Sequence, residues 1–245
     1  MPSYENQGER TSNVFAGKGC SAASQKIYGE SAALFAALID DAHSSADGPY
    51  VLADIGSFKG ELMVELIERL RSHAFNTIAV DINREALANN LADRRIVADV
   101  VDTQLPDKSV DLTICRYVLQ WNPPDKQRHI LRELDRITKR TVILQHFGCD
   151  DSDPSHRVHI DAALSGEHVP KLLRKDYYLS TAQEIEGWFA HDGLPFVRQA
   201  HLRVDGLSDS FIDRYNLNRS DARKLKDLLG VYDYIVLTTW TLRRE

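Results

Sequence analysis

The stretch of sequence that decides the fold is VLADIGSFKGEL, residues 51–62. Its first five residues are apolar apart from Asp54, which is typical of a strand buried on both faces of a sheet. Gly56 and Gly60 follow in the spacing D-x-G-x-x-x-G, and an amphipathic helix is expected at 61–71. Glycine allows a sharp turn and a close approach to the backbone, and a helix N-terminus offers free N–H groups to a ligand. The sequence therefore predicts a ligand site at this strand–helix junction.

The segments around this junction alternate between strands and helices. We expect strands at 50–55, 76–81, 94–99, 109–116, 140–147, 195–204 and 232–242, and helices at 24–43, 61–71, 84–91, 124–137, 181–190 and 208–229. Such alternation indicates βαβ units and an α/β fold with a doubly wound, mainly parallel sheet. The polar stretch at 148–180 shows no clear period, and a long stretch of this kind is usually a functional loop or a lid.

Composition limits the class of protein. The 245 residues are 43% hydrophobic, carry a formal net charge of −6 and include three cysteines without metal-like spacing. The balance of charge argues against a nucleic-acid partner, and the cysteines are expected to be reduced thiols. The N-terminus is polar, and no apolar run approaches the ~18 residues of a membrane span. We therefore expect a cytoplasmic protein without a membrane span, in an oligomeric state that the sequence leaves open.

Acidic residues end three successive strands. Asp54 ends the first strand, Asp81 the second, 21 residues after Gly60, and Asp99 the third. An acid at about 20 residues past a glycine loop is placed to accept hydrogen bonds from ribose hydroxyls. Each carboxylate alone fits a solvated cap at a strand end. Together they indicate a ligand at the carboxyl edge of the sheet, where open α/β sheets bind ligands.

The loop lacks the dinucleotide pattern G-x-G-x-x-G, because Phe58 stands where the middle glycine would be. It resembles instead motif I of class I S-adenosylmethionine-dependent methyltransferases, commonly D-x-G-x-G-x-G, and residues 48–147 are similar to the core of the UbiE-like members. The resemblance implies a Rossmann-like sheet of seven strands with the seventh antiparallel. It also implies S-adenosyl-L-methionine as cofactor and S-adenosyl-L-homocysteine as product.

The resemblance also implies roles for single residues. The glycine loop would wrap the methionine and ribose part of the cofactor, and the acid of the third strand would accept a hydrogen bond from the adenine amino group. The expected cofactor-binding residues are Asp54, Gly56, Ser57, Gly60, Asp81, Ile82, Asp99, Val100 and Arg116. Tyr28, Tyr117 and Gln120 are candidates for the substrate side.

His146 is the candidate catalytic residue. It ends the fifth strand, where a neutral imidazole can take a proton from a hydroxyl or an amine as the methyl group arrives. The alternative is a histidine that is only hydrogen-bonded at the strand end. A strong base is often unnecessary, because the cofactor brings the reactive methyl group and the protein mainly orients the reactants.

Two other patterns favour plain structural roles. His156 and His159 follow an acidic stretch, but DDSDPSH argues against a helix that would put both rings on one face, so we expect no metal site. The run Asn122-Pro123-Pro124 resembles the N-P-P-aromatic motif of amino-group methyltransferases. However, Asp125 replaces the aromatic residue, and we expect Asn122 to cap the helix that the prolines open.

These expectations give a flexible arm at 1–23 and one methyltransferase domain at 24–245. Within the domain, 48–147 would bind the cofactor, and 148–180 and 208–229 would cover the substrate. The function expected is methylation of a small molecule at oxygen, nitrogen or carbon. Two alternatives stay open, a tRNA or protein methyltransferase and a cofactor-binding module without catalysis, which Phe58 filling the loop would favour.

Overall fold

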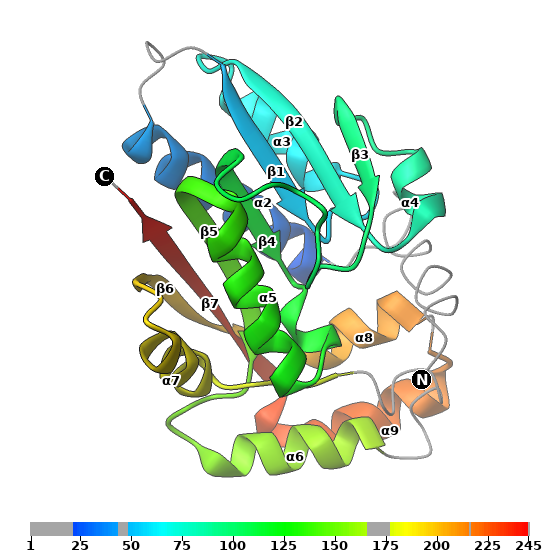
Figure 1. Ribbon diagram of the computed structural model, residues 1–245. Coiled ribbons are helices and arrows are strands. Elements are labelled where there is room, and N and C mark those ends of the chain that lie inside the picture. The colour runs from blue at the N-terminus through cyan, green and yellow to red at the C-terminus, as the bar shows by residue number, and fades with distance from the viewer. Residues whose placement is uncertain (1–21, 44–48, 166–176, 216, 245) are drawn as a thin grey trace.

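The computed structural model describes residues 22–43, 49–165, 177–215 and 217–244. Its centre is one seven-stranded sheet in the order β3-β2-β1-β4-β5-β7-β6 (Figure 1). The strands are β1 (Tyr50–Ile55), β2 (Phe75–Asp81), β3 (Arg94–Val97), β4 (Val110–Arg116), β5 (Thr138–Gly148), β6 (Phe196–Asp205) and β7 (Tyr234–Arg243). The first five strands pair in parallel, and β7 runs antiparallel to both neighbours. The predicted fold class is confirmed.

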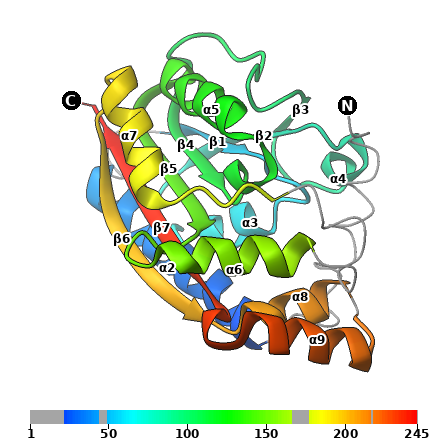
Figure 2. The same cartoon turned by 90° about the horizontal axis from the view of Figure 1, so that it is seen from below.

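Helices cover both faces of the sheet (Figure 2). They are α2 (Ala22–Ala42), α3 (Glu61–Arg69), α4 (Arg84–Ala88), α5 (Pro124–Ile137), α6 (Pro154–Ser165), α7 (Ala182–Asp192), α8 (Leu207–Tyr215) and α9 (Arg219–Leu229), with 3-10 turns at η2 (Leu119–Trp121) and η3 (Gly230–Tyr232). Val142 and Leu144 of β5 pack with α5 and α7, whereas Ile143 packs with α2 and α3. Each central strand is therefore buried on both sides, which explains its continuous apolar run.

The polar stretch after β5 contains a helix that its sequence pattern did not reveal. α6 begins at Pro154, and the Asp153 carboxylate accepts the backbone N–H of Ser155 at 2.9 Å. Ile160 and Ala163 are buried on this helix, whereas Val158 is 66% exposed. An apolar face as narrow as this one produces little periodicity in the sequence. The expectation that DDSDPSH argues against a helix is therefore wrong, because the helix begins at Pro154 within that stretch.

The start of α5 also differs from the prediction. Its N-cap residue is Pro123, with Pro124 as the first helical residue. The Asn122 side chain donates instead to the backbone carbonyl of Val118 at 2.9 Å. The predicted side-chain cap is therefore wrong, because Asn122 turns back to close the 3-10 turn before the helix. The helix ends without a glycine, as its sequence indicated, and β5 begins at the next residue.

The helices α6, α8 and α9 lie beyond the carboxyl ends of β4 and β5. Residues of α6, α8 and α9 form one apolar cluster with the end of β5 and the start of β7, including Phe147, Ile160, Phe211 and Leu225. Figures 1 and 2 show these helices side by side below the sheet. Residues 1–21 and 166–176 lie outside the described part of the chain, so the division into an arm at 1–23, a core and a cover stays a prediction.

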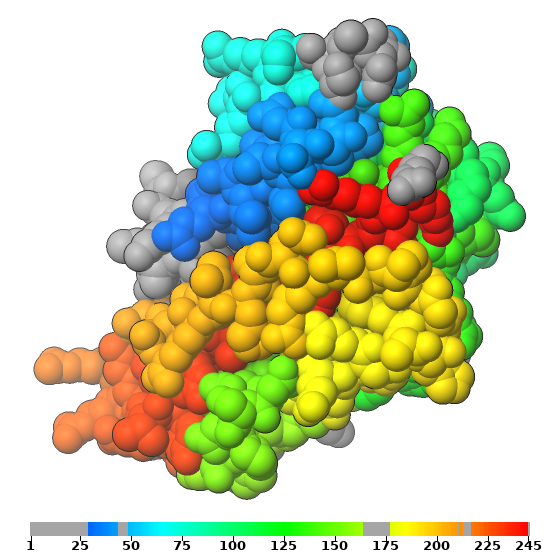
Figure 3. All heavy atoms as spheres, turned by 90° about the vertical axis from the view of Figure 1, so that its left-hand side faces the viewer, coloured from blue at the N-terminus to red at the C-terminus, as the bar shows by residue number. Residues whose placement is uncertain are grey.

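The last strand in the sheet order lies at the molecular surface. β6 crosses the face shown in Figure 3, and its Val197 and Leu202 side chains are 60% and 47% exposed. Arg198 and Arg203 lie on the same strand, and the pairing register shifts between Arg198 and Ala200. Charged side chains and a bulge are the usual protection of an edge strand against pairing with other chains.

Candidate functional site

The loop after β1 makes an unusual turn at the carboxyl edge of the sheet. Gly56, Phe58 and Gly60 all have positive φ angles, of 76°, 49° and 84°. A Cβ atom at Gly56 would lie 2.3 Å from Cγ2 of Val118, so this position requires glycine. Phe58 is a bulky residue in a conformation that such residues rarely adopt, which costs free energy and has to be held by its surroundings.

Asp81 holds the middle of this loop. Its carboxylate accepts the backbone N–H of Phe58 and that of Asn83, each at 2.8 Å. Burial raises the pKa of Asp81, and the backbone N–H groups of Asn83, Phe58 and Ile82 oppose that rise. A carboxylate has about four lone-pair positions, so further acceptor positions remain beside the loop. The neighbouring Ile82 is 37% exposed.

Asn90 holds the loop from the other side, and no sequence pattern pointed to this residue. Its Nδ2 donates to Oγ of Ser57 at 3.3 Å and to the carbonyl oxygen of Phe58 at 3.2 Å. A Cβ atom at Gly60 would lie 2.7 Å from this side chain. In the sequence Asn90 falls inside the helix expected at 84–91, and only the fold brings its side chain against the glycine loop.

Asp54 lies at the end of β1 and is only 4% exposed. Burial, followed by the nearby Asp81 carboxylate, raises the pKa of Asp54 to about 7. Arg116, at the end of β4, acts in the opposite sense. The site therefore contains a carboxyl group that is poised between its neutral and its ionised form near pH 7.

Asp99 follows β3 and forms an ion pair that the sequence did not predict. Its Oδ2 lies 2.9 Å from Nζ of Lys126 on α5, and its Oδ1 accepts the backbone N–H of Val101 at 3.2 Å. The next residue, Val100, is 9% exposed. Lys126 thus fixes the orientation of the carboxylate that was expected to meet an adenine ring.

Arg116 and Tyr117 form a stacked pair at the end of β4. The Arg116 guanidinium lies 4.1 Å from the centre of the Tyr117 ring, and its Nε donates to Oε1 of Gln145 at 3.2 Å. Tyr117 has a φ of 58°. Its hydroxyl is buried and has no hydrogen-bond partner in the part of the chain that the structure describes. Backbone strain and an unpaired polar group together are typical of functional positions.

Gln120 and His146 lie deeper than expected for residues that meet a substrate. Gln120 is fully buried and donates to the carbonyl oxygen of Tyr117 at 2.7 Å. His146 is 1% exposed, and its Nε2 donates to the carbonyl oxygen of Ser180 at 3.0 Å. Burial lowers the pKa of His146 to about 4, so the ring is neutral at pH 7. Ser180, at the end of residues 177–180, therefore covers the His146 ring. Tyr28 belongs to α2, but its side chain lies outside the described residues.

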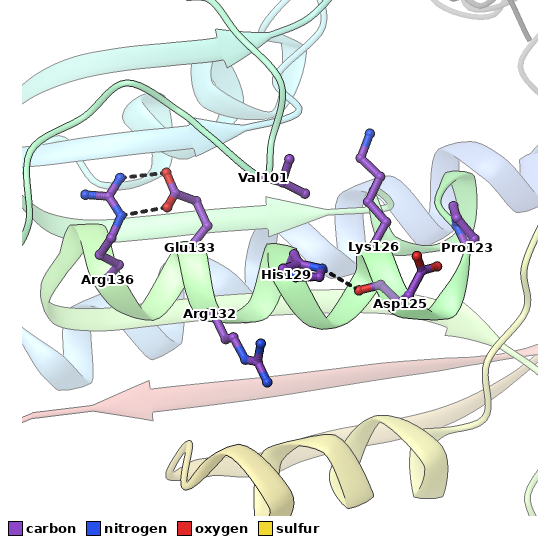
Figure 4. Close-up of a pocket in the computed structure, with 8 residues that line it drawn as sticks. All are labelled: Val101, Pro123, Asp125, Lys126, His129, Arg132, Glu133 and Arg136. Carbon is purple, nitrogen blue, oxygen red and sulfur yellow. Dashed lines mark hydrogen bonds and ion pairs between the residues drawn. The ribbon is translucent and has the colours of Figure 1, made fainter. Parts of the chain in front are cut away.

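A surface pocket of about 490 Å³ lies beside this edge, along the outer face of α5 (Figure 4). Its lining comes from α5, Pro123 and Val101, without a residue of the 56–60 loop. Its cations are already paired, since Arg132 binds Asp192 and Arg136 binds Glu133. Lys126 pairs with Asp99, so each lysine and arginine of this lining already has an acidic partner within the described residues.

The histidines of α6 have structural partners. Nδ1 of His156 accepts the backbone N–H of Asp150, and Nε2 donates to the carbonyl oxygen of Tyr234. The His159 ring stacks on Tyr232. Across residues 22–43, 49–165, 177–215 and 217–244, no group of three or more potential ligands could hold a metal ion. In the same ranges, no helix is both long and apolar enough to cross a bilayer.

Comparison with known proteins identifies the domain. Residues 53–144 match the family model described as a methyltransferase domain. The fold is similar to the YcgJ protein of Bacillus subtilis, at 15% identity over 88% of this chain and 99% of that chain, with a TM-score of 0.64. It is also similar to the cyclopropane synthase MmaA2 of Mycobacterium tuberculosis, at 14% identity over 95% and 88% of the two chains, with a TM-score of 0.64.

A third similar structure is the magnesium protoporphyrin IX methyltransferase of Synechocystis, crystallised with S-adenosylmethionine. It shares 13% identity over 96% of this chain and 90% of that chain, with a TM-score of 0.56. No curated protein sequence matches the chain significantly. The family match covers the glycine loop and the strand-end acids, and the whole sheet has the fold of these enzymes. Residues 53–144 thus form a methyltransferase domain, and the whole sheet has the Rossmann-like fold of S-adenosylmethionine-dependent methyltransferases.

Proposed function

We propose that the protein transfers a methyl group from S-adenosylmethionine to a small molecule. The observation that carries this proposal is the loop of residues 56–60, held above the Asp81 carboxylate beside two further acids, Asp54 and Asp99. In this proposal Gly56, Ser57 and Gly60 line the methionine and ribose part of the cofactor. Asp81 and Ile82 lie at the ribose, and Asp99 and Val100 at the adenine.

The residues fit the cofactor chemically. Asp81 keeps acceptor positions for ribose hydroxyls after binding two backbone N–H groups. Asp54 can supply a negative charge near a sulfonium, because it ionises near pH 7. The bound cofactor supplies the reactive methyl group. The chain then has to orient the acceptor at the ends of β4 and β5, and we assign this role to Tyr117 with Arg116 stacked on its ring.

A small acceptor is supported by the similar structures and by the surface. Two of them are a cyclopropane synthase and a magnesium protoporphyrin IX methyltransferase. Arg132 and Arg136 of the pocket along α5 already pair with Asp192 and Glu133, so this pocket does not favour a tRNA acceptor. The role of His146 as a general base has little support, because the His146 ring is buried and hydrogen-bonded to Ser180. We therefore favour Tyr117 as the residue that meets the substrate.

The direct test is calorimetry with S-adenosylmethionine, S-adenosylhomocysteine and NAD. We expect low-micromolar or tighter binding of the two sulfur nucleosides and no binding of NAD. Labelled S-adenosylmethionine should then transfer its methyl group to a fraction of small metabolites, and not to tRNA or protein fractions. Tight binding of NAD alone would overturn the assignment. Transfer to tRNA or protein would contradict the small acceptor but not the reaction.

A single substitution tests the position of the ribose. Asp81→Asn should weaken S-adenosylmethionine binding roughly tenfold to a hundredfold, because charge-assisted hydrogen bonds are lost. Asparagine keeps one acceptor oxygen and so retains one of the two backbone hydrogen bonds, and the melting temperature of the variant reports any loosening of the loop. Asp205→Asn is the matched control, since Asp205 also ends a strand but lies exposed on β6. Equal affinities of the Asp81 variant and the parent would show that Asp81 only holds the loop.

A further inference from the structure

The backbone of Phe58 is held on both sides. Its N–H group donates to Oδ2 of Asp81 at 2.8 Å, and its carbonyl oxygen accepts from Nδ2 of Asn90 at 3.2 Å. These bonds fix the peptide groups on either side of a residue with a φ of 49°. Glycine would adopt this conformation without strain, whereas phenylalanine needs support from its neighbours.

The orientation of the Asn90 amide follows from its other contact. Its Oδ1 accepts the backbone N–H of Ala92 at 3.0 Å, so Nδ2 has to face the loop. There it reaches both Ser57 and Phe58, and the side chain also fills the space beside Gly60. Asn90 is 2% exposed, which protects these bonds from exchange with water. One side chain thus contacts three of the five residues in the 56–60 loop.

The main chain of Asn90 is fixed independently of the loop. Its N–H donates to the carbonyl oxygen of Leu87 at 3.0 Å, and its own carbonyl accepts from Arg95 at 3.3 Å. The side chain therefore projects from an anchored position between α4 and β3. A loop residue cannot move away from Asn90 without breaking a buried hydrogen bond, which is costly when the donor stays buried.

We propose that Asn90 is a positioning residue for the cofactor, acting through the loop and not by contact with substrate. It compensates for the missing glycine at position 58 by holding the left-handed turn that the cofactor has to meet. This inference rests on the proposed role of the 56–60 loop in binding S-adenosylmethionine.

The test compares S-adenosylmethionine affinity in two Asn90 variants. Asn90→Ala removes the amide, and Asn90→Asp keeps the shape and the acceptor for Ala92 but removes the donor. Both should weaken binding about tenfold or more, measured by calorimetry well below the melting temperature of each variant. Asn89→Ala is the matched control, because the adjacent Asn89 is exposed and bonds only within α4. It should keep the affinity of the parent.

A second control separates positioning from loss of stability. Ile185→Ala empties a fully buried site on α7, away from the loop, and should lower the melting temperature without weakening binding. Parent-like affinity in both Asn90 variants would overturn the inference, as would an equal loss of affinity in Ile185→Ala. If the parent itself binds no S-adenosylmethionine, the proposed function fails and not the role of Asn90 alone.

Discussion

At the scale of single residues, the three acids of the site differ in their hydrogen-bond partners and in their surroundings. Asp81 is fixed by two backbone N–H groups, Asp99 by Lys126 and the N–H of Val101. Asp54 is instead buried near another carboxylate, and this raises its pKa to about 7. The three acids that look alike in the sequence therefore differ in burial and in the groups that bind them.

The state of Asp54 predicts a pH dependence of cofactor binding. A cationic ligand favours the ionised carboxylate, so S-adenosylmethionine should bind more tightly as the pH rises from about 6 to about 8. Below pH 7 the affinity should fall by up to about tenfold per pH unit, with release of up to one proton on binding. Calorimetry in buffers of different ionisation enthalpy measures both quantities. Asp54→Asn should bind more weakly and lose this dependence, and an unchanged pH profile in the variant would exclude Asp54 as its source.

At the scale of secondary-structure elements, the start of α7 connects several neighbouring segments by hydrogen bonds and an ion pair. α7 begins with a capping box, in which Oγ1 of Thr181 accepts the N–H of Glu184 and Oε2 of Glu184 accepts the N–H of Thr181. Glu184 also binds Arg157 of α6, which donates to the carbonyl oxygen of Leu179. The start of α7 thus links α6 to Leu179 and Ser180, the residues beside His146.

Loss of this cap should have a measurable effect on stability. Thr181→Ala should lower the free energy of unfolding by about 1 kcal/mol, because the N–H of Glu184 loses its acceptor. In a chain of this size that corresponds to a fall in melting temperature of about 2–4 °C. Thr181→Ser keeps the hydroxyl and should stay close to the parent. Equal melting temperatures of the alanine variant and the parent would show that water replaces the cap at no cost.

At the scale of the whole molecule, two buried histidines connect elements that lie far apart in the sequence. His146 binds the carbonyl oxygen of Ser180, and His156 on α6 binds that of Tyr234 at the start of β7. Burial lowers the pKa of both rings, so the fold favours their neutral forms. Their contribution to stability is complete above pH 6.5, the ordinary value, and is lost as the pH falls below it. For His146 the loss continues to about pH 4.

This loss is best measured as a difference, because Asp54, whose pKa is raised, acts in the opposite sense over the same range. Relative to His146→Leu, the parent should lose up to about 1.4 kcal/mol of unfolding free energy for each pH unit between 6.5 and 4. Urea denaturation of both proteins across this range measures it. Leu144→Ala, on the same face of β5, should differ from the parent by a constant amount. A constant difference for His146→Leu as well would contradict the assignment.

The sequence by itself determined the sheet and the line of acids along its edge. Apolar runs such as YVLADI reflect burial on both faces, and the glycines at 56 and 60 mark a turn whose φ angles are positive. Both are local properties of the backbone and its side chains, so they are visible without knowing which residues meet. The family resemblance drew on the same residues and was confirmed.

Only the tertiary structure decided which side chains contact the loop, the acids and the histidine of the site. Asn90 contacts a loop about 30 residues earlier in the chain, Lys126 contacts an acid 27 residues before it, and His146 is closed off by Ser180, 34 residues later. No period or motif encodes such pairs, because each depends on the packing of separate elements. The pattern of α6 was not recognised for a related reason, since its few buried residues pack in one cluster with α8 and α9 and leave little periodicity in the sequence.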